Sequence, residues 1–401
     1  MKLLWVAPCF LHPTTRGGQI RTLEIVKRLH LRHEVHFAGL ADPDQPEGPS
    51  RASEYCSRLI AEPHRLPPRG SAAFAAQLVR GLFDPMPVAI ARTASAGLRR
   101  SVSAAIRENR YDHIICDFLA SAPNVETLEN AVLFQHNVET MIWRRHAEHA
   151  GSAPRRAYFQ LQAARMEAYE RDVCRRSRAV IAVSAADRDY FQSRFGASRC
   201  GDVPTGVDTA YFAPPPGGPA RRGLVFSGSM DWMPNIDGIL WFAREILPLL
   251  WRTHPDCRLT IAGRKPDPAI MALAAGEPRI AVTGTVPDIR PYLWEAAISI
   301  VPLRIGGGTR LKIYESMAAG APTVSTTIGA EGLSYTDGEH LKIADLPAAF
   351  AEACAHLLDH PDEAARIDTA ARRMVAEQFS WDRVIDSFEN QLTLSAGAAR
   401  K

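Results

Sequence analysis

One segment of this chain combines glycines, cations and a carboxylate in an order suited to a phosphorylated nucleoside. Residues 306–309 read Gly-Gly-Gly-Thr, and Arg310, Lys312 and Glu315 follow on a helical pattern. Glycines let a backbone approach a ligand closely, and free N–H groups at a helix start favour phosphate. Cations in a helix's first turn oppose its dipole, so a bound anion would explain Arg310 and Lys312. A loop that merely packs against its helix is the alternative.

Glu315 lies further along the same helix, where its carboxylate could accept hydrogen bonds from two vicinal hydroxyls, as in a ribose. A second Gly-Gly pair, Gly17 and Gly18, ends the loop 8–18 immediately before a helical pattern at 19–31. This loop matches neither the dinucleotide-binding nor the P-loop pattern, which argues against an NAD enzyme or an NTPase. Its glycines could meet the same diphosphate, with a plain structural turn as an equal alternative.

His136 follows an expected strand at 132–135. A histidine at a strand's carboxyl end is expected to point into a cleft rather than the core. It could then hydrogen-bond a sugar hydroxyl or help move a proton. A structural histidine is equally common at such a position, so both interpretations stay open.

The strands and helices expected to position these residues form two successive series along the chain. Short apolar runs of strand length alternate with helical patterns, which indicates β-α-β units and mainly parallel sheets. The pattern restarts after Ala-Pro-Pro-Pro-Gly-Gly-Pro at 213–219, a stretch unsuited to helix or strand. The expected strands are 3–7, 35–40, 113–116, 132–135 and 180–183, then 224–227, 259–262, 280–282, 298–302 and 323–325.

We therefore expect an α/β protein with two Rossmann-like domains whose parallel sheets face each other across a deep cleft. Ligands bind beyond the carboxyl ends of such strands. We also expect the helical pattern at 381–392 to pack back on the N-terminal domain. The expected divisions are 1–205 for the N-terminal domain, 206–222 for a linker, 223–378 for the C-terminal domain and 379–401 for the C-terminal helix and tail.

Bulk composition narrows the function classes. The 401 residues are 46% hydrophobic and 23% charged, with a net charge of only +3. These values fit a globular protein and give no basic excess for nucleic acid. The seven cysteines are scattered without C-x-x-C, which indicates reduced thiols in a cytoplasmic protein and no zinc site. No run reaches the roughly 18 apolar residues of a membrane span, so we expect any membrane contact to be peripheral, at the inner face.

Several stretches resemble family 4 retaining glycosyltransferases of the GT-B fold, the glycosyl transferases of group 1. They are residues 306–322, residues 284–288 (Gly-Thr-Val-Pro-Asp) and residues 204–208 (Pro-Thr-Gly-Val-Asp). Residues 226–235 and 241–248 resemble the subgroup associated with bacterial exopolysaccharide and exosortase loci. The resemblance spans nearly the whole chain. It implies that residues 1–205 form the acceptor-side domain and residues 223–378 the nucleotide-sugar-binding domain. It implies transfer of a hexose-type sugar from a nucleoside-diphosphate sugar, UDP- or GDP-linked, to a glycan, lipid-linked glycan or small-molecule acceptor.

The resemblance also implies roles for single residues. It implies that Glu315 binds the donor ribose, that the backbone at Val286 contacts the nucleotide base and that His136 contacts the transferred sugar. The residues assigned to donor binding are Gly17, Gly18, Val286, Gly306, Gly307, Gly308, Thr309 and Glu315, and those assigned to catalysis are His136, Arg310 and Lys312.

Two departures from the family pattern matter. Many members have a glutamate that contacts the transferred sugar where this chain has Gly307. Many also have an arginine and a lysine soon after the first strand of the second domain, where residues 227–231 hold no cation. We infer that Arg310 and Lys312 supply that charge and that transfer needs no metal and no cofactor. The alternatives are a catalytically inactive nucleotide-sugar-binding module and a GT-B sugar-nucleotide epimerase.

Three other features favour ordinary surface structure. Asp42 and Asp44 could bind a metal in a different fold, but a solvated turn is favoured. His146 and His149 lack a further zinc ligand, which favours a surface helix. Residues 143–178 hold nine arginines against four acids, and a solvated helix face is favoured over contact with anionic lipid.

Overall fold

The computed structural model describes residues 1–14, 17–68, 70–305 and 311–397. The chain divides into two compact units. Unit 1 comprises Met1–Pro204 together with Val384–Lys401, and unit 2 comprises Thr205–Arg383.

Unit 1 is built on a seven-stranded parallel sheet in the order β3-β2-β1-β4-β5-β6-β7. The order reverses between β1 and β4, as in doubly wound Rossmann folds. The strands are β1 (Lys2–Ala7), β2 (Glu34–Ala41), β3 (Arg58–Pro63), β4 (His113–Asp117), β5 (Ala131–Phe134), β6 (Ala179–Ala182) and β7 (Cys200–Asp202). The main helices are α1 (Gly17–Arg32), α3 (Ala72–Phe83), α4 (Val88–Ala91), α5 (Ala96–Glu108), α6 (Glu139–Glu148), α7 (Ala153–Arg176) and α8 (Ala185–Phe195).

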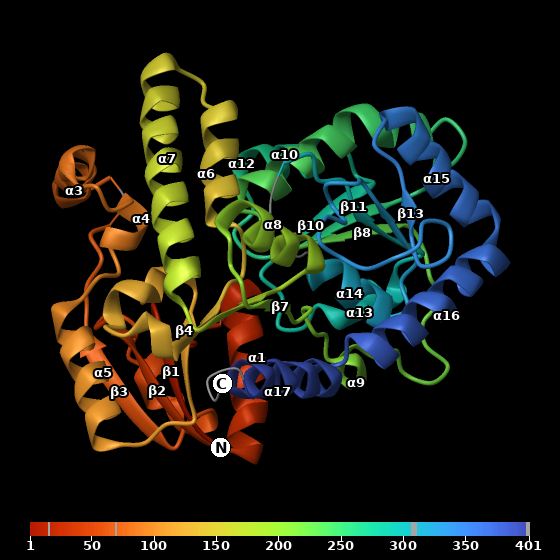
Figure 1. Cartoon of the computed structure of the whole chain (residues 1–401). Coiled ribbons are helices and arrows are strands. Elements are labelled where there is room, and N and C mark those ends of the chain that lie inside the picture. Colours follow the sequence, from red (N-terminus) through yellow and green to blue (C-terminus); the bar gives the residue numbers. More distant parts are fainter. Residues whose placement is uncertain (15–16, 69, 306–310, 398–401) are drawn as a thin grey trace. The chain divides into compact units, whose positions relative to one another are not determined.

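Unit 2 repeats the plan with a six-stranded parallel sheet in the order β10-β9-β8-β11-β12-β13, and helices lie on both of its faces (Figure 1). The strands are β8 (Leu224–Ser227), β9 (Leu259–Ala262), β10 (Ile280–Gly284), β11 (Ile298–Val301), β12 (Thr323–Ser325) and β13 (Lys342–Ile343). The main helices are α9 (Thr209–Phe212), α10 (Met233–Trp241), α12 (Pro268–Gly276), α13 (Arg290–Glu295), α14 (Leu311–Ala318), α15 (Pro347–Asp359) and α16 (Pro361–Gln378).

The C-terminal helix α17 (Trp381–Gly397) joins unit 1 from Val384 onward. The ring of Phe388 stacks on Trp5 of β1 with centroids 5.7 Å apart, and it meets Phe134 of β5 edge-on. All three side chains are fully buried. The expectation that this helix packs back on the N-terminal domain is confirmed.

Each expected strand is present within a few residues of its predicted ends. The sequence did not predict β3, β7 and β13, which lie at the edges of the two sheets. All seven cysteines are free thiols. Among the described residues, no helix has the length and apolar character that crossing a membrane would require.

Candidate functional site

The loops that follow β8 and β9 in unit 2 are joined through their backbones. The N–H of Gly228 donates to the carbonyl of Ala262 at 3.0 Å, and the N–H of Met230 donates to the carbonyl of Arg264 at 2.9 Å. A Cβ atom on Gly263 would lie 1.7 Å from the carbonyl oxygen of Gly228, so only glycine permits this approach. These two loops form one backbone surface at the carboxyl edge of the sheet, where open parallel sheets bind ligands.

Lys312 reaches this surface from α14. Its Nζ donates to Oδ1 of Asn235 at 3.0 Å and lies 4.1 Å from the ring centroid of Phe226. Asn235 is buried and donates its amide to the carbonyl of Ser229 at 2.8 Å. A Cβ atom on Gly228 would lie 2.8 Å from the lysine Nζ. The ammonium is therefore held against the loop after β8, the loop in which the sequence showed no cation.

The loop after β9 carries two cations that the sequence reasoning missed. Arg264 Nη2 and Lys265 Nζ each lie 3.9 Å from the carboxylate of Asp231. A hydrogen bond from Ser229, with Arg264 nearby, holds the pKa of Asp231 below its ordinary value. Lys265 has a φ of +51°, which is uncommon for a residue with a side chain. The sequence Gly-Arg-Lys at 263–265, directly after β9, could have indicated them. In the sequence, cations were looked for only after β8.

Glu315 lies on α14, one turn from Lys312, and is partly buried. Desolvation raises the pKa of its carboxyl to about 7, and the positive charge of Lys312 offsets part of that effect. The opposite side of α14 is anchored in the core, where Tyr314 stacks on Phe379 and Ser316 shares a 2.8 Å hydrogen bond with Ser299 of β11. The helix therefore presents a carboxyl group whose charge changes near neutral pH.

Of the other donor residues predicted in unit 2, the structure describes Val286 alone. Val286 is partly buried in the loop after β10, between Gly284 and a 2.7 Å ion pair of Asp288 with Arg290. Gly306, Gly307, Gly308, Thr309 and Arg310 lie outside the described residues. In the chain order they stand between β11 and α14. Their donor and catalytic roles stay predictions.

Gly17 and Gly18 are the first two residues of α1 in unit 1, a helix without an acidic residue in its first turn. A Cβ atom on Gly18 would lie 2.7 Å from Cζ of Phe118, so the glycine lets that ring pack against the helix start. Phe118 itself has a φ of +63°, in a region that side chains rarely adopt. The close packing gives Gly18 a structural reason, and its predicted contact with a diphosphate stays a prediction.

His136 does not point away from the core as its position at a strand end suggested. Its side chain is 1% exposed, and its ring stacks on Phe118 with centroids 3.7 Å apart. Nη1 of Arg21 donates to Nδ1 at 3.1 Å, because a guanidinium can only donate. The proton therefore lies on Nε2, which donates to Oδ1 of Asp117 at 2.7 Å. Burial lowers the pKa of His136, so the neutral ring is favoured.

Asp117 is the centre of this buried group and was not predicted from the sequence. Its second oxygen accepts a hydrogen bond from the Thr22 hydroxyl at 2.8 Å. Arg21 is 4% exposed, and desolvation lowers its pKa to about 10. Asp117, Arg21 and Thr22 lie on β4 and α1, so two distant stretches of sequence fix the orientation of the His136 ring. A ligand could bond to a ring nitrogen only if Arg21 or Asp117 gave up its hydrogen bond.

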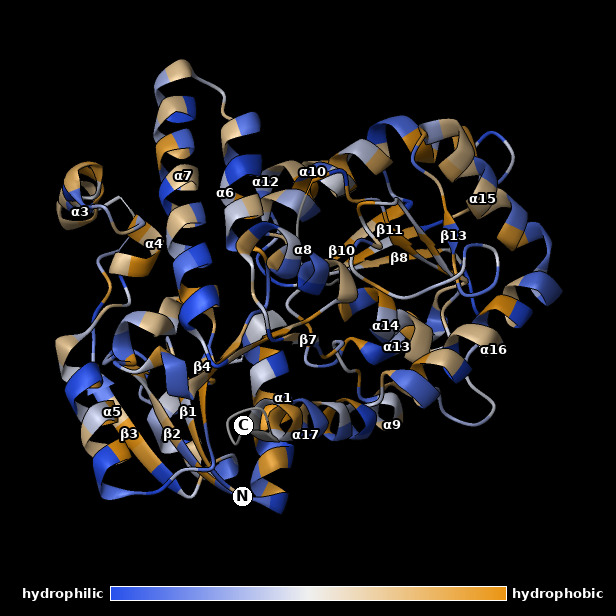
Figure 2. Ribbon diagram, viewed as in Figure 1, coloured by the Kyte–Doolittle hydropathy of each residue, from blue (hydrophilic) through white to orange (hydrophobic). Residues whose placement is uncertain are grey.

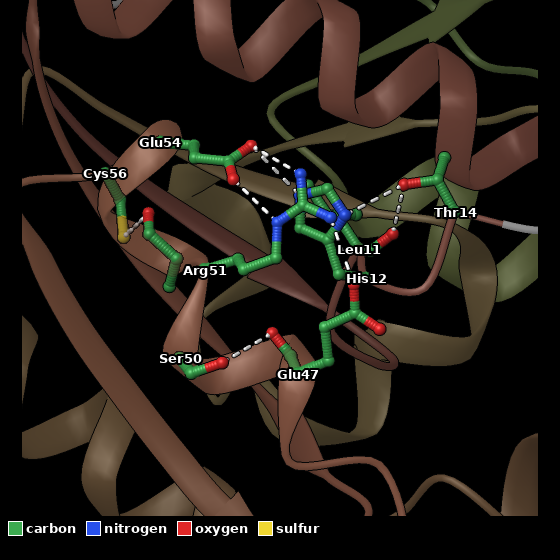
Figure 3. Close-up of polar contacts among 9 residues, drawn as sticks. Leu11, His12, Thr14, Glu47, Ser50, Arg51, Glu54 and Cys56 are labelled. Carbon is green, nitrogen blue, oxygen red and sulfur yellow. Dashed lines mark hydrogen bonds and ion pairs between the residues drawn. The ribbon is translucent and has the colours of Figure 1, made fainter.

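The loop between β1 and α1 is held by a second polar group, shown in Figure 3. His12 is buried, with Nδ1 3.1 Å from the Thr14 hydroxyl and Nε2 3.3 Å from a carboxylate oxygen of Glu54. Arg51 binds Glu54 at 2.7 Å and Glu47 at 3.0 Å. Burial, followed by the charge of Arg51, lowers the pKa of His12. These contacts fix the loop that leads to Gly17.

Among the described residues, no group of three or more His, Cys, Asp or Glu side chains could hold a metal ion. The carboxylate of Asp42 accepts hydrogen bonds from the backbone N–H of Asp44 and from the Gln45 side chain, which makes an ordinary exposed turn. His149 bonds to the carbonyl of Arg145 on its own helix. The surface interpretation of both features agrees with these contacts.

The two units together define the class of protein. Sucrose-phosphate synthase from Thermosynechococcus elongatus superposes over 100% of both chains, with a TM-score of 0.71 and 18% identity. HepE from Anabaena, solved with UDP, gives a TM-score of 0.67 and 14% identity over 98% of this chain and 100% of that chain. HepE solved with UDP-glucose gives a TM-score of 0.65. The fold is therefore the two-domain GT-B fold.

Comparison of the sequence adds the family. A model described as Glycosyltransferase Family 4 matches residues 15–211, and one described as Glycosyl transferases group 1 matches residues 221–360. The chain belongs to the family 4 glycosyltransferases, as the sequence predicted. Glycogen synthase from Mycobacterium tuberculosis is 28% identical over 55% of this chain and 55% of its own length. The curated relatives are matched over 36 to 55% of their own lengths. The narrower subgroup stays a prediction.

Proposed function

We propose that this protein is a glycosyltransferase that moves a hexose-type sugar from a nucleoside-diphosphate sugar to an acceptor. The observation that carries the proposal is the group of side chains at the carboxyl edge of the unit 2 sheet. There Lys312 lies against the loop after β8, and Glu315 follows one turn later on the same helix. The cation suits a diphosphate, and the carboxyl suits vicinal ribose hydroxyls. Family membership adds the reaction class.

The donor is proposed to be UDP-linked or GDP-linked. HepE, which shares the fold, was solved with UDP and with UDP-glucose, and this favours the uridine form as the first to test. In this arrangement Glu315 binds the ribose and the backbone at Val286 meets the base. The glycines and threonine of residues 306–309 approach the phosphates and the sugar, with Gly17 and Gly18 as a further phosphate contact.

The proposed mechanism is metal-independent transfer with retention of configuration. When the bond to the anomeric carbon breaks, negative charge develops on the leaving diphosphate, and fixed cations stabilise that charge most in the transition state. Arg310 and Lys312 are assigned this role, and Arg264 and Lys265 add positive charge on the adjacent loop. His136 is assigned a contact with the transferred sugar, which would require its bond to Arg21 or Asp117 to open.

The acceptor is proposed to be a glycan, a lipid-linked glycan or a small molecule, in the cytoplasm of a bacterium that makes polysaccharide. Peripheral contact with an anionic membrane was considered for residues 143–178. In the structure several arginines of α6 and α7 are already bonded: Arg144 and Arg171 to Glu167, and Arg175 to the carbonyl of Phe195. These pairs favour a structural use of that basic surface.

A donor panel tests the proposal. UDP-, GDP- and ADP-sugars are first screened by the rise in melting temperature, because a ligand of the native state must stabilise it. The donors that bind are then assayed for transfer and hydrolysis, with and without EDTA. Turnover that survives EDTA is expected. Binding without turnover on any acceptor would favour an inactive binding module, and an epimerised donor would favour an epimerase. Loss of activity in EDTA would contradict the metal-free mechanism.

A further inference from the structure

The turn that joins β5 to α6 carries polar side chains at Gln135, His136, Asn137 and Glu139. Gln135 and His136 are buried. Gln135 is bonded through both its oxygen and its nitrogen, and His136 through both ring nitrogens. Asn137 and Glu139 are partly exposed. A ligand can therefore reach Asn137 and Glu139 without opening the buried network around His136.

The start of α6 has a carboxylate partner other than Glu139. Helices α6 and α7 lie side by side, and both carry hydrophilic residues along their lengths (Figure 2). Glu170 of α7 is nevertheless fully buried. Its two oxygens accept from the N–H groups of Glu139 and Thr140, each at 2.9 Å, and from the Thr140 hydroxyl at 2.6 Å. Glu170 thus satisfies the first N–H groups of the helix, and the carboxyl of Glu139 is not needed for that purpose.

The carboxyl of Glu139 is held at an energetic cost. Burial raises its pKa to about 7, and a hydrogen bond from Asn137 opposes the shift. Burial also raises the pKa of Glu170 to about 8, with the hydrogen bonds of Thr140 acting against it and the charge of Glu139 adding to it. Among the described residues no cation forms an ion pair with Glu139. An acidic group kept in such surroundings without a structural bond of its own indicates a functional use.

The position of the turn and the chemistry of its two side chains indicate the ligand. The turn lies at the carboxyl edge of the unit 1 sheet, where open parallel sheets bind ligands. A carboxylate repels phosphate but accepts hydrogen bonds from hydroxyl groups, and the Asn137 amide both donates and accepts. An uncharged polyol such as a sugar suits this pair, whereas a diphosphate does not.

We propose that Glu139, together with Asn137, binds a hydroxyl group of a sugar at the carboxyl edge of unit 1. The hydroxyl donates to the carboxylate of Glu139 and accepts from the amide of Asn137. The inference rests on the proposed transfer of a sugar, and the hydroxyl belongs either to the acceptor or to the sugar of the donor. This contact requires neither ring nitrogen of His136 to give up its hydrogen bond.

Two sets of probes distinguish the two sources of the hydroxyl. The methyl glycosides of glucose, galactose and mannose are titrated in saturation-transfer difference NMR. UDP-glucose is compared with UDP, and GDP-mannose with GDP, by titration calorimetry. At pH 8 the variant Glu139→Gln should weaken at least one sugar probe about tenfold or more, because a charged hydrogen bond is lost, and Asn137→Ala should weaken it about fivefold. A weakened methyl glycoside indicates the acceptor, and a nucleotide sugar weakened more than its nucleotide indicates the sugar of the donor.

The dependence on pH separates ligand binding from a structural role. Wild-type affinity for the same probe should fall about tenfold between pH 8 and pH 6, because the carboxyl is mostly ionised at pH 8 and only about one tenth ionised at pH 6. This dependence should be absent in Glu139→Gln. The other titratable groups at the turn, which are Glu170 of α7 and His136 with Asp117 bonded to it, remain in that variant. The matched control Glu148→Gln, at the exposed end of the same helix, should bind every probe like the wild type.

Equal affinity of the wild type and Glu139→Gln for every probe would overturn the proposal, as would a pH dependence that persists in the variant. Equal weakening of UDP and UDP-glucose, or binding of nucleotides without any binding of a sugar, would also overturn it, while leaving the proposed transfer reaction to the donor panel. Glycoside binding that depends on Glu139 in a protein without transferase activity would support the contact and count against the reaction. If Glu139→Gln does not fold, Asn137→Ala and the wild-type pH dependence decide.

Discussion

Replacing Glu315 by glutamine separates the energetic cost of its carboxyl from its proposed use in donor binding. Desolvation raises the pKa of this group from 4.5 to about 7. At about 1.4 kcal/mol for each tenfold change in proton affinity, such a difference corresponds to about 3 kcal/mol at most. The side chain is partly exposed, and solvent screening reduces the effect. We therefore expect the ionised carboxyl to lower the free energy of unfolding of the ligand-free protein by about 1–3 kcal/mol.

The sign follows from which state holds the proton more tightly. The folded-state pKa lies above the unfolded value, so the stabilisation from the neutral carboxyl is fully present below about pH 4.5 and is lost as pH rises through about 7. Glutamine stays neutral throughout. The Glu315→Gln variant should therefore be more stable than the wild type at pH 8 by about 1–3 kcal/mol, and by less than about 1 kcal/mol at pH 5.

Urea unfolding followed by tryptophan fluorescence measures this difference, because five of the seven tryptophans lie in unit 2. Titration calorimetry with UDP and GDP then measures nucleotide affinity. Loss of the charged hydrogen bonds should cost about 1.5–3 kcal/mol, or at least about tenfold in Kd. Wild-type affinity should itself weaken as pH falls below about 7, and that dependence should be absent in the variant.

The control Glu377→Gln, on the exposed face of α16, should change neither stability nor affinity. A Glu315→Gln variant that is less stable than the wild type at pH 8 would refute the argument from desolvation. Unchanged nucleotide affinity would refute the ribose role even if the stability result held.

Four further substitutions test separate parts of the protein. Arg310→Ala and Lys312→Met should each lower kcat by roughly 10²-fold, by analogy with losing one donor to a developing charge, and activity within a few-fold of wild type would contradict the leaving-group role. Gly263→Ala places a methyl group where the carbonyl of Gly228 lies, and should destabilise unit 2 by about 3 kcal/mol or less, measured by thermal melting. Asp117→Asn removes one of the two carboxylates, with Asp187, whose charge favours the buried Arg21 cation. Urea unfolding followed by circular dichroism should therefore show a loss of about 3 kcal/mol, and a neutral outcome would contradict the buried network.

The strands show which parts of the fold local sequence determines. The central strands were predicted because both faces are covered, so their sequences are continuous apolar runs such as Ala-Val-Leu-Phe in β5. Of the four edge strands, β10 was predicted, whereas β3, β7 and β13 were missed. β3 has an alternating, half-exposed pattern, and β13 has only two residues. An edge strand has a neighbour on one side only, so more of its residues are exposed and polar and the apolar signal is weak.

In the candidate site too, local sequence predicted some features and contacts between distant residues determined the others. Lys312 and Glu315 lie three residues apart on one helix, so the sequence by itself placed them together after a glycine-rich loop. The contact of Lys312 with Asn235 joins residues 77 positions apart. It exists because parallel strands bring their carboxyl ends to one edge, which no local pattern reveals. Arg264 and Lys265 became candidates for the same reason.

His136 shows what tertiary structure alone decided. The sequence correctly placed this residue after a buried strand, and position alone suggested a ring directed away from the core. Arg21, 115 residues distant, and Asp117 on the neighbouring strand instead bind both ring nitrogens. A buried polar side chain must find partners, and these come from whichever elements the fold packs beside it. Local sequence determined the elements and the family, whereas packing between distant elements determined the orientation and protonation of the groups they carry.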